Sequence, residues 1–404
     1  MKFKKIFNKI IKKSASALGF DIIRRDKGNY IDQRVVTLAP GTAAKGNVLL
    51  GFIIEPFLRE SGEPISNAHS HDRESFKMAE TFLEMGYCVD VISYRNSTFI
   101  PRKPYSIFVA ARTNFERIAR LLDDSCIKIV HQDTAHWLFN NHAAYSRLLA
   151  LQERRGLTLY SARIVEPNWA VEYADYITIL GNQFTIDTYK YAGKEIYRIP
   201  ISVPAIYPWP EDRDMEACCK NYVWFGSSGF VHKGLDLVLE AFLDMPDYHL
   251  TICGPLDQDA AFQKAFHKEL YETPNIHTVG WVDIESEHFL NITRNCIGLI
   301  YPSCAEGGGG SALTCMHAGL IPVVSYETSI DVDDFGIVLR ENTIAEIKST
   351  IKSLSALPKH DLLKRARLAW EYARNNHTRE RFADIYKKTI DIIINESRKS
   401  QGGG

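Results

Sequence analysis

Residues 305–314 contain the combination of residue types that points most directly to chemistry: Glu306, four consecutive glycines at 307–310, and then Ser311. A run of glycine loses much backbone entropy on folding, so its presence indicates a backbone that another group must approach closely. Phosphate suits that role, because free amides at a helix start attract negative charge and glycine leaves the approach open. The alternative is a plain tight turn, although such a turn usually needs only one glycine.

The glycine run lies between an expected strand at 297–303 and an expected helix at 311–319, for which Ser311 is the candidate N-cap. This order places the run at the carboxyl edge of a sheet, where doubly wound sheets bind ligands. Glu306 would repel a phosphate directly. We therefore expect its carboxylate to accept hydrogen bonds from neutral hydroxyl groups beside the anion.

Apolar strands alternate with helices in both halves of the chain, which predicts parallel sheets covered on both faces. In the first half, strands are expected at 48–57, 88–94, 105–111, 127–133, 158–162 and 174–180, with helices at 75–86 and 115–124. In the second half, strands are expected at 222–228, 249–254, 276–282, 297–303 and 321–326, with helices at 234–245, 260–271, 285–295 and 311–319. Four prolines between Pro200 and Pro210 interrupt the pattern and mark a linker.

The predicted fold class is therefore α/β, with two Rossmann-like doubly wound domains that face a cleft. The expected segments are 1–45, a basic N-terminal segment; 46–203, the first domain; 204–375, the second domain; and 376–400, a C-terminal helix that packs back on the first domain. A length of 404 residues agrees with two separately cored domains.

The composition favours a small-molecule site over a nucleic-acid interface, because the formal net charge is −1 and no basic surface is indicated. The eight cysteines include no CxxC pair, so reduced thiols in a cytoplasmic protein are expected rather than a zinc ribbon or a disulfide framework. No apolar run is long enough to span a bilayer.

Residues 1–25 predict a basic amphipathic helix, with apolar residues at helical spacing, six lysines among the first 13 residues, and no acid before Asp21. Such a helix can lie on an anionic membrane surface, which predicts peripheral association with the inner face of the membrane. The alternatives are a charged helix packed on the protein itself or a disordered tail.

The segment YPSCAEGGGGSALTCMHAGLIPVVS resembles the donor-binding segment of glycosyltransferase family four, in which PS, EGFG, a second Glu and a G-x-PVV strand are typical. WFGSSGFVHKGLDLVLEAF is similar to that family's G-R-L…KG helix entry, and ADYITILGNQFTIDTYKYAG is similar to the end of its first domain. The resemblance covers most of the chain from about residue 47. It implies a GT-B fold and transfer of a sugar from a nucleotide-sugar, with retention of anomeric configuration and without a metal or other cofactor.

The resemblance also implies roles for individual residues. Glu306, His131 and Lys233 would be the catalytic residues: Glu306 would contact the donor sugar, Lys233 would neutralise the departing diphosphate, and His131 would lie near the sugar. The positions implied for donor binding are Gly226, Ser227, Ser228, Lys233, Trp281, Val282, Glu306, Gly308, Gly309, Gly310, Ser311 and Thr314.

Four features depart from the family pattern. The second Glu, which grips the ribose, is replaced by Thr314, and the basic residue after Gly226 is replaced by Ser227 and Ser228. The spacing from Gly226 to Lys233 is one residue longer, and the double-glycine loop near the start of the first domain is missing. Weaker nucleotide affinity is expected, because a hydroxyl makes an uncharged bond and a diphosphate-binding cation is lost.

Two groups of histidines have residue types that can ligate a metal. His69, His71 and Asp72 form an HxHD sequence, for which the alternatives are a metal site, a polar loop facing the cleft, or a cap of the helix expected to begin near Glu74. His131, His136 and His142 share one segment, but their spacing fits no single strand face or helix register. No metal is expected at either place, and a satisfied buried histidine is the alternative for His131.

The expected function is transfer of a sugar from a nucleoside diphosphate to a hydroxyl of a membrane-proximal or lipid-linked glycan, in surface polysaccharide biosynthesis. The alternative is a catalytically silent GT-B subunit that acts as a binding or scaffolding protein. An epimerase or phosphorylase on the same fold is a third reading. No P-loop, GxGxxG motif or Ser/His/Asp order is present.

Overall fold

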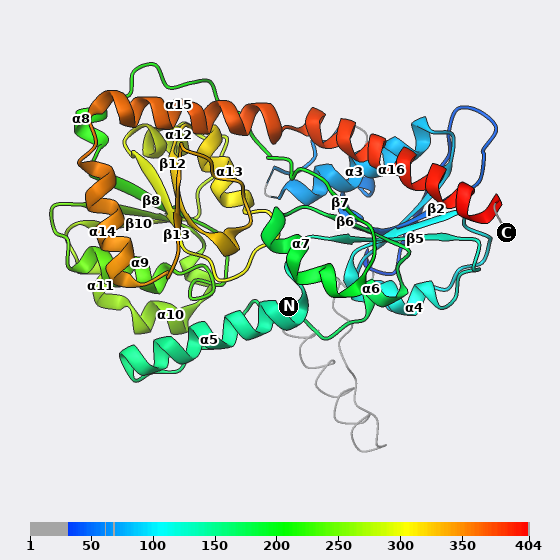
Figure 1. The fold of residues 1–404 in the computed structure, drawn as a ribbon, viewed down its shortest axis with the longest axis horizontal. Coiled ribbons are helices and arrows are strands. Elements are labelled where there is room, and N and C mark those ends of the chain that lie inside the picture. Colours follow the sequence, from blue (N-terminus) through cyan, green and yellow to red (C-terminus); the bar gives the residue numbers. More distant parts are fainter. Residues whose placement is uncertain (1–30, 61, 68, 403–404) are drawn as a thin grey trace, which may run out of the picture.

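The computed structural model describes residues 31–60, 62–67 and 69–402, which form two α/β lobes side by side (Figure 1). The predicted basic helix at 1–25 lies outside the described residues. Within the described part of the chain, no helix is both long and apolar enough to cross a membrane.

The first sheet has seven strands in the order β1-β3-β2-β4-β5-β6-β7. All neighbours are parallel except β1, which pairs with β3 in the antiparallel sense. Its strands are β1 (Val35–Leu38), β2 (Asn47–Phe52), β3 (Cys88–Ser93), β4 (Ile107–Ala110), β5 (Ile127–Gln132), β6 (Tyr176–Ile179) and β7 (Ile196–Arg198). The central strands read as continuous apolar runs because helices cover both faces.

The second sheet has six parallel strands in the order β10-β9-β8-β11-β12-β13. They are β8 (Asn221–Phe225), β9 (His249–Cys253), β10 (Ile276–Gly280), β11 (Gly298–Tyr301), β12 (Ile321–Ser325) and β13 (Ile337–Leu339). The strand order reverses between β8 and β11, so a crevice for a ligand is expected beyond the carboxyl ends of these two strands. The expected α/β fold of two doubly wound domains is confirmed.

The helices of the first lobe are α3 (Ser70–Glu84), α4 (Phe115–Ala119), α5 (Trp137–Arg155), α6 (Ala170–Tyr173) and α7 (Gln183–Tyr189). Those of the second lobe are α8 (Met215–Cys218), α9 (Leu235–Leu243), α10 (Ala260–Ala265), α11 (His267–Tyr271), α12 (Glu287–Arg294), α13 (Gly310–His317), α14 (Ile344–Ser355) and α15 (Lys359–Asn376). The remaining long helix is α16 (Arg379–Gly402), which runs back across the first lobe beside α3 (Figure 1).

Helix α5 joins the two lobes. It leaves the first sheet after β5 and extends beneath the second lobe (Figure 1). Near its end, Arg154 pairs with Asp236 at 2.6 Å and Arg155 pairs with Glu269 at 2.6 Å. Because the two carboxylates are almost fully buried, these ion pairs tie α5 firmly to the second lobe.

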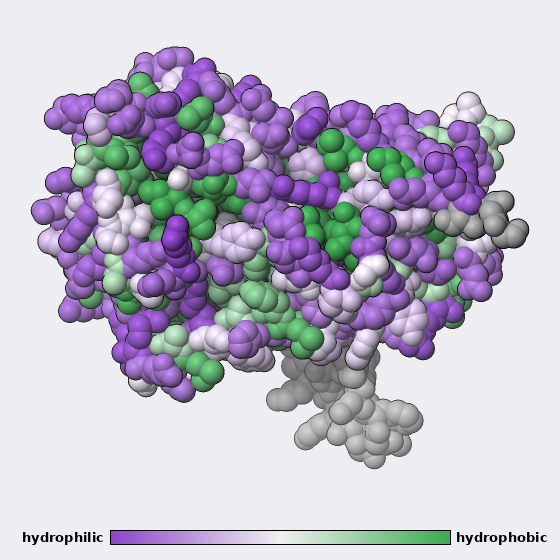
Figure 2. All heavy atoms as spheres, in the orientation of Figure 1, coloured by the Kyte–Doolittle hydropathy of each residue, from purple (hydrophilic) through white to green (hydrophobic). Residues whose placement is uncertain are grey.

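The face of the molecule seen in Figure 2 is largely hydrophilic, with hydrophobic residues in separate patches. The apolar side chains gather instead in the core, where Val48, Leu50, Trp224 and Leu299 are fully buried. Burial of this kind is the main favourable term in folding.

Four local expectations were wrong. Residues 158–162 form no strand but an irregular connection after α5. The helix expected at 260–271 is divided into α10 and α11. Helix α13 begins at Gly310 with Gly309 as its N-cap, not at Ser311. Helix α3 begins at Ser70 with His69 as its N-cap, five residues before the expected start at 75.

Candidate functional site

The glycine run connects β11 to α13 and touches the first lobe. A side chain at position 307 would overlap the backbone of Asp133, the residue that follows β5. At Gly309, whose φ is +54°, an added Cβ would lie 2.8 Å from the carbonyl oxygen of Thr328. Both positions therefore require glycine because of contacts within the protein. Packing within the protein therefore explains the glycines at positions 307 and 309 without any ligand.

The start of α13 is less constrained. An added Cβ at Gly310 would meet only Ile201, at an ordinary distance of 3.4 Å. The first amides of a helix have no partner within the helix, and they carry the positive end of its dipole. Gly310 and Ser311 are half-buried, so the start of α13 is the part of the run at which the backbone is partly accessible.

Glu306, directly before the glycines, holds a dense hydrogen-bond network. Its Oε1 atom accepts hydrogen bonds from Lys233 Nζ at 2.9 Å, from the Tyr301 hydroxyl at 2.9 Å, and from Ser303 Oγ at 3.0 Å. Its Oε2 atom lies 3.6 Å from Nη2 of Arg163. Burial alone would raise the pKa of the Glu306 carboxyl, but the positive charges of Lys233 and Arg163 outweigh burial and hold the pKa well below its ordinary value. Glu306 is therefore a carboxylate at neutral pH.

Lys233 reaches Glu306 from the loop between β8 and α9. Its stem lies over Gly226, where an added Cβ would be 3.3 Å from Lys233 Cδ. The ammonium also donates to the Tyr301 hydroxyl at 2.5 Å. Lys233 is only 3 % exposed and Glu306 only 8 %, so both charged groups are shielded from solvent. The structure thus brings together two of the three expected catalytic residues, from loops 73 positions apart.

His131 lies at the end of β5, in the first lobe. It is fully buried; Nδ1 pairs with Thr178 Oγ1 at 2.9 Å, and Nε2 has no hydrogen-bond partner among the described residues. Burial lowers its pKa to about 4, so the ring is neutral at pH 7. Asp133, two residues later, contacts the glycine run, which puts the end of β5 beside the Glu306 loop.

A charged cluster at the same edge of the first sheet contains three residues that the sequence analysis did not single out. Asp133 pairs with Arg112, and its Oδ2 atom lies 3.9 Å from Nε2 of His71. The Nδ1 atom of His71 lies 2.8 Å from Glu74 Oε2. Burial opposes the protonated ring, but Glu74 and Asp133 prevail and raise the pKa of His71 to about 9. His71 is therefore a cation that already has two carboxylate partners.

The other two residues of the HxHD sequence lie apart from this cluster. His69 is exposed at the N-cap of α3, and Asp72 occupies the first turn of that helix. Among the described residues, no group of three His, Cys, Asp or Glu side chains has the arrangement of a metal site. Of the three residues, only His71 belongs to the charged cluster beside Asp133.

The remaining expected donor residues differ in accessibility. Ser227 and Ser228 are half-buried in the β8 loop, and Gly308 is buried with φ +142°. Beyond β10, Trp281 is 58 % exposed while Val282 is buried. Thr314 is buried, and its hydroxyl donates to the Gly310 carbonyl oxygen at 2.9 Å, so its hydrogen is already used within α13.

Arg163 is the component of the site that sequence reasoning missed. It directly follows residues 158–162, which were expected to form a strand, and it approaches both the β8 loop and Glu306. The only local signal was the pair Asn140 and Asn141, whose side chains hold this connection through the backbone of Arg163 and Val165. Such a signal cannot be interpreted before the contact is known.

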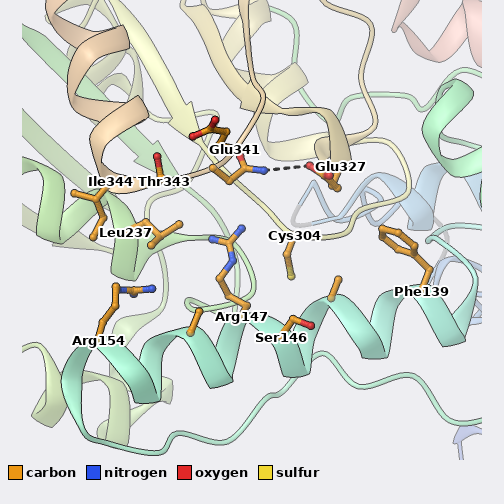
Figure 3. Close-up of a pocket in the computed structure, with 13 residues that line it drawn as sticks. Phe139, Ser146, Arg147, Arg154, Leu237, Cys304, Glu327, Glu341, Thr343 and Ile344 are labelled. Carbon is orange, nitrogen blue, oxygen red and sulfur yellow. Dashed lines mark hydrogen bonds between the residues drawn. The ribbon is translucent and has the colours of Figure 1, made fainter.

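A separate cavity of about 430 Å³ lies between α5 and the carboxyl edge of the second sheet (Figure 3). Arg147 projects from α5 toward the side of the cavity on which Glu341 lies (Figure 3). The Asn342 amide, which also lines the cavity, donates to Glu327 at 3.3 Å. Neither Glu306 nor Lys233 belongs to the residues that line it. Cys304, in the Glu306 loop, does line it, so this loop separates the cavity from the carboxylate network.

Comparisons with known proteins support the fold. No protein-family model matches the sequence, and no curated protein matches it. Among solved structures, sucrose-phosphate synthase from Thermosynechococcus elongatus is similar with a TM-score of 0.62 and 12% identity, over 87% of this chain and all of that one. HepE from Anabaena, solved in complex with UDP and glucose, is similar with a TM-score of 0.52 and 12% identity, over 86% of this chain and 99% of that one.

TarM is also similar, with a TM-score of 0.52 and 15% identity over 71% of this chain; the match spans about half of TarM, 54% of its length. At these identities the likeness concerns the architecture, which is that of two facing Rossmann-like domains. The chain therefore has the GT-B fold.

Proposed function

We propose that this protein is a retaining glycosyltransferase, similar to family four, that moves a sugar from a nucleoside-diphosphate sugar to a hydroxyl acceptor. The observation that carries the proposal is the Lys233–Glu306 pair at the start of α13, between the strands where the order of the second sheet reverses. A cation and helix amides suit the diphosphate, and the carboxylate suits the hydroxyls of the sugar.

In this mechanism, the bound nucleotide-sugar donor replaces the contacts that Glu306 and Lys233 make with each other. Lys233 would neutralise charge as the diphosphate departs, and Glu306 would hold the sugar on the face that the acceptor attacks. The bond from the anomeric carbon to the diphosphate breaks while the bond to the acceptor oxygen forms, and a diphosphate oxygen takes the acceptor proton. No step of this proposal uses a metal or another cofactor. The similarity of the fold to HepE, which was solved with UDP and glucose, makes UDP-sugars the first donors to test.

The acceptor is proposed to be a lipid-linked or membrane-proximal glycan in surface polysaccharide biosynthesis. This part rests on the basic sequence of residues 1–25, which would hold the protein at the inner face of a membrane. Sedimentation of the full chain with vesicles tests it: binding is expected with phosphatidylglycerol vesicles and not with neutral phosphatidylcholine. Replacing Lys4, Lys5 and Lys9 by Glu should abolish the binding, and equal binding to both vesicles would contradict the proposal.

Activity is tested by incubating the full chain with a panel of nucleotide sugars and a polyprenyl-linked acceptor. Transfer is expected with the wild type and is expected to fall at least about a hundredfold in Glu306→Ala, because the carboxylate would act on the reacting sugar. Lys359→Ala removes an exposed ion pair with Glu216 and is the control, with activity expected to be unchanged. Equal transfer activity in the wild type and in Glu306→Ala would contradict the assignment of Glu306 to the active site.

The second candidate is a catalytically silent GT-B subunit that binds or scaffolds. It is favoured by the burial of Lys233 and Glu306 against each other and by the use of the Thr314 hydroxyl inside α13. Calorimetry with UDP, GDP and their sugars separates the candidates, since a silent subunit should bind none of them. An epimerase or phosphorylase would bind nucleotide or phosphate but would form no glycosidic bond to the polyprenyl-linked acceptor.

A further inference from the structure

We infer that Arg163, a residue of the first domain, is the second cation of the diphosphate site in the second domain. The inference rests on the proposed function and adds to it a residue that reaches the donor across the domain boundary. The two serines after Gly226 leave the β8 loop without a basic side chain at that point, and Arg163 lies against the same loop.

The position of Arg163 is defined by contacts on two sides. Its aliphatic stem packs on Gly229, where an added Cβ would lie 2.5 Å from Cγ of Arg163. Gly229 has a φ of +91°, so this turn of the β8 loop favours glycine and leaves space for the arginine stem. The guanidinium then extends to Glu306, with Nη2 3.6 Å from Oε2. Arg163 thus bridges the loops that follow β8 and β11.

The charges around Glu306 do not cancel. One carboxylate faces two basic side chains, Lys233 at Oε1 and Arg163 at Oε2, so basic groups outnumber acidic ones at the start of α13; burial lowers the pKa of Lys233, and the charge of Glu306 opposes that shift. The neighbouring ring of His232 adds no positive charge, because burial lowers its pKa to about 4. A dianionic group would find both cations and the positive end of the helix dipole at one place.

Of the two basic side chains, Arg163 is the more exposed and the less tightly bound to Glu306. Its side chain is 37 % exposed, compared with 4 % for Lys233, and its distance to Glu306 is longer than a hydrogen bond. Among the described residues, none accepts a hydrogen bond from the guanidinium, which contacts Glu306 only as an ion pair. Its five N–H donors are therefore available for a phosphate, which a guanidinium binds in a bidentate manner.

The backbone of Arg163 is held in advance. The buried side chain of Asn140 donates to the Arg163 carbonyl oxygen at 2.8 Å. The next side chain, Asn141, binds both the amide and the carbonyl group of Val165, at 2.9 and 2.8 Å. Both asparagines belong to α5, which is tied to the second domain by Arg154 and Arg155. Arg163 is consequently positioned by the contact between the domains, and diphosphate binding should depend on that contact.

Calorimetry of the full chain tests the inference with UDP, UMP and uridine, and in parallel with GDP, GMP and guanosine. For the series that binds the wild type, Arg163→Ala should weaken diphosphate binding by about ten- to a hundredfold and leave nucleoside binding unchanged. Arg163→Lys should recover part of the loss, because the charge is kept but the bidentate geometry is not. Arg163→Gln replaces Arg163→Ala if the alanine variant does not fold.

Arg155→Ala is the matched control. It removes another arginine that pairs across the domains, with Glu269, at a place where no ligand is proposed. Its effect should be the same for diphosphate and nucleoside. Undiminished diphosphate binding by Arg163→Ala, or an equal loss for diphosphate and nucleoside, would overturn the inference while leaving the proposed function standing. A wild type that binds no nucleoside diphosphate would overturn both.

Discussion

Nζ of Lys233 lies 2.9 Å from Oε1 of Glu306, although the two residues belong to different loops and both side chains are almost completely buried. Taking two charges out of water is costly, and the pair offsets this only while both partners are present. The contact therefore has consequences for stability as well as for chemistry, and the two can be measured separately.

Removing one member of this pair should destabilise the protein strongly. Glu306→Gln or Lys233→Met is expected to lower the free energy of unfolding by about 3 kcal/mol, because each leaves a buried charge without its partner. The double variant should lose clearly less than the sum of the two single losses, and it should still lack sugar transfer. Denaturant unfolding of the four proteins measures this coupling, and strictly additive losses would contradict it.

The glycines at 307 and 310 should respond differently to the same substitution. Gly307→Ala places a methyl group on the backbone of Asp133, so the domains would have to separate, and the free energy of unfolding should fall by more than about 2 kcal/mol. Gly310→Ala has room, and its stability should change by less than about 0.5 kcal/mol. If the start of α13 holds phosphate, Gly310→Ala should nevertheless weaken UDP binding in calorimetry. A stable Gly307→Ala protein would show that the contact between the domains is not required.

The pH dependence of stability should reveal His71. Its pKa is raised to about 9 in the folded state from 6.5 in the unfolded state, so the folded protein binds the extra proton between these values. The resulting stabilisation is fully present below pH 6.5 and is lost as the pH rises through 9. The loss of stability caused by His71→Gln should thus be at least about 1 kcal/mol larger at pH 6 than at pH 10. Equal losses at both pH values would contradict the ion pairs of His71.

His131 should change the pH dependence of stability in the opposite direction, by lowering the stability of the protein at acidic pH. Burial lowers its pKa to about 4, so below pH 6.5 the unfolded state binds a proton that the folded state resists. The penalty grows as the pH falls from 6.5 to 4. The wild type should therefore lose more stability than His131→Gln between pH 7 and pH 4.5. Urea unfolding at several pH values measures these free energies of unfolding. Equal losses in the wild type and in His131→Gln over this range would show that the ring is not held neutral.

The connection that carries Arg163 should loosen when Asn141 is replaced. Asn141→Ala removes both hydrogen bonds to Val165, so hydrogen exchange at 158–166 should become faster and diphosphate affinity should fall several-fold, less than in Arg163→Ala. Ser146→Ala, on the same helix but facing the cavity of Figure 3, should leave both unchanged. Unchanged exchange in Asn141→Ala would show that Asn140 alone holds the connection.

The sequence by itself determined the two α/β domains, since apolar strands alternating with helices bury their faces in few other ways. It also determined that Glu306 and the glycines follow a central strand of the second sheet, because that order is local. Its errors were local too: residues 158–162 have the composition of a strand, but they lie in an irregular connection whose next residues, Arg163 and Val165, are bound at their backbone by side chains of α5.

Only the tertiary structure decided which side chains meet. The contact of Lys233 with Glu306, of Asp133 with Gly307, and of Arg163 with the β8 loop each join segments far apart in the chain. No sequence period or spacing encodes such contacts, because the first depends on the strand order within the second domain and the other two on how the two domains pack against each other. The contact between the domains constrains Gly307 and packing within the second domain constrains Gly309, so Gly310 and Ser311, at the start of α13, are the positions at which we propose that an anion binds.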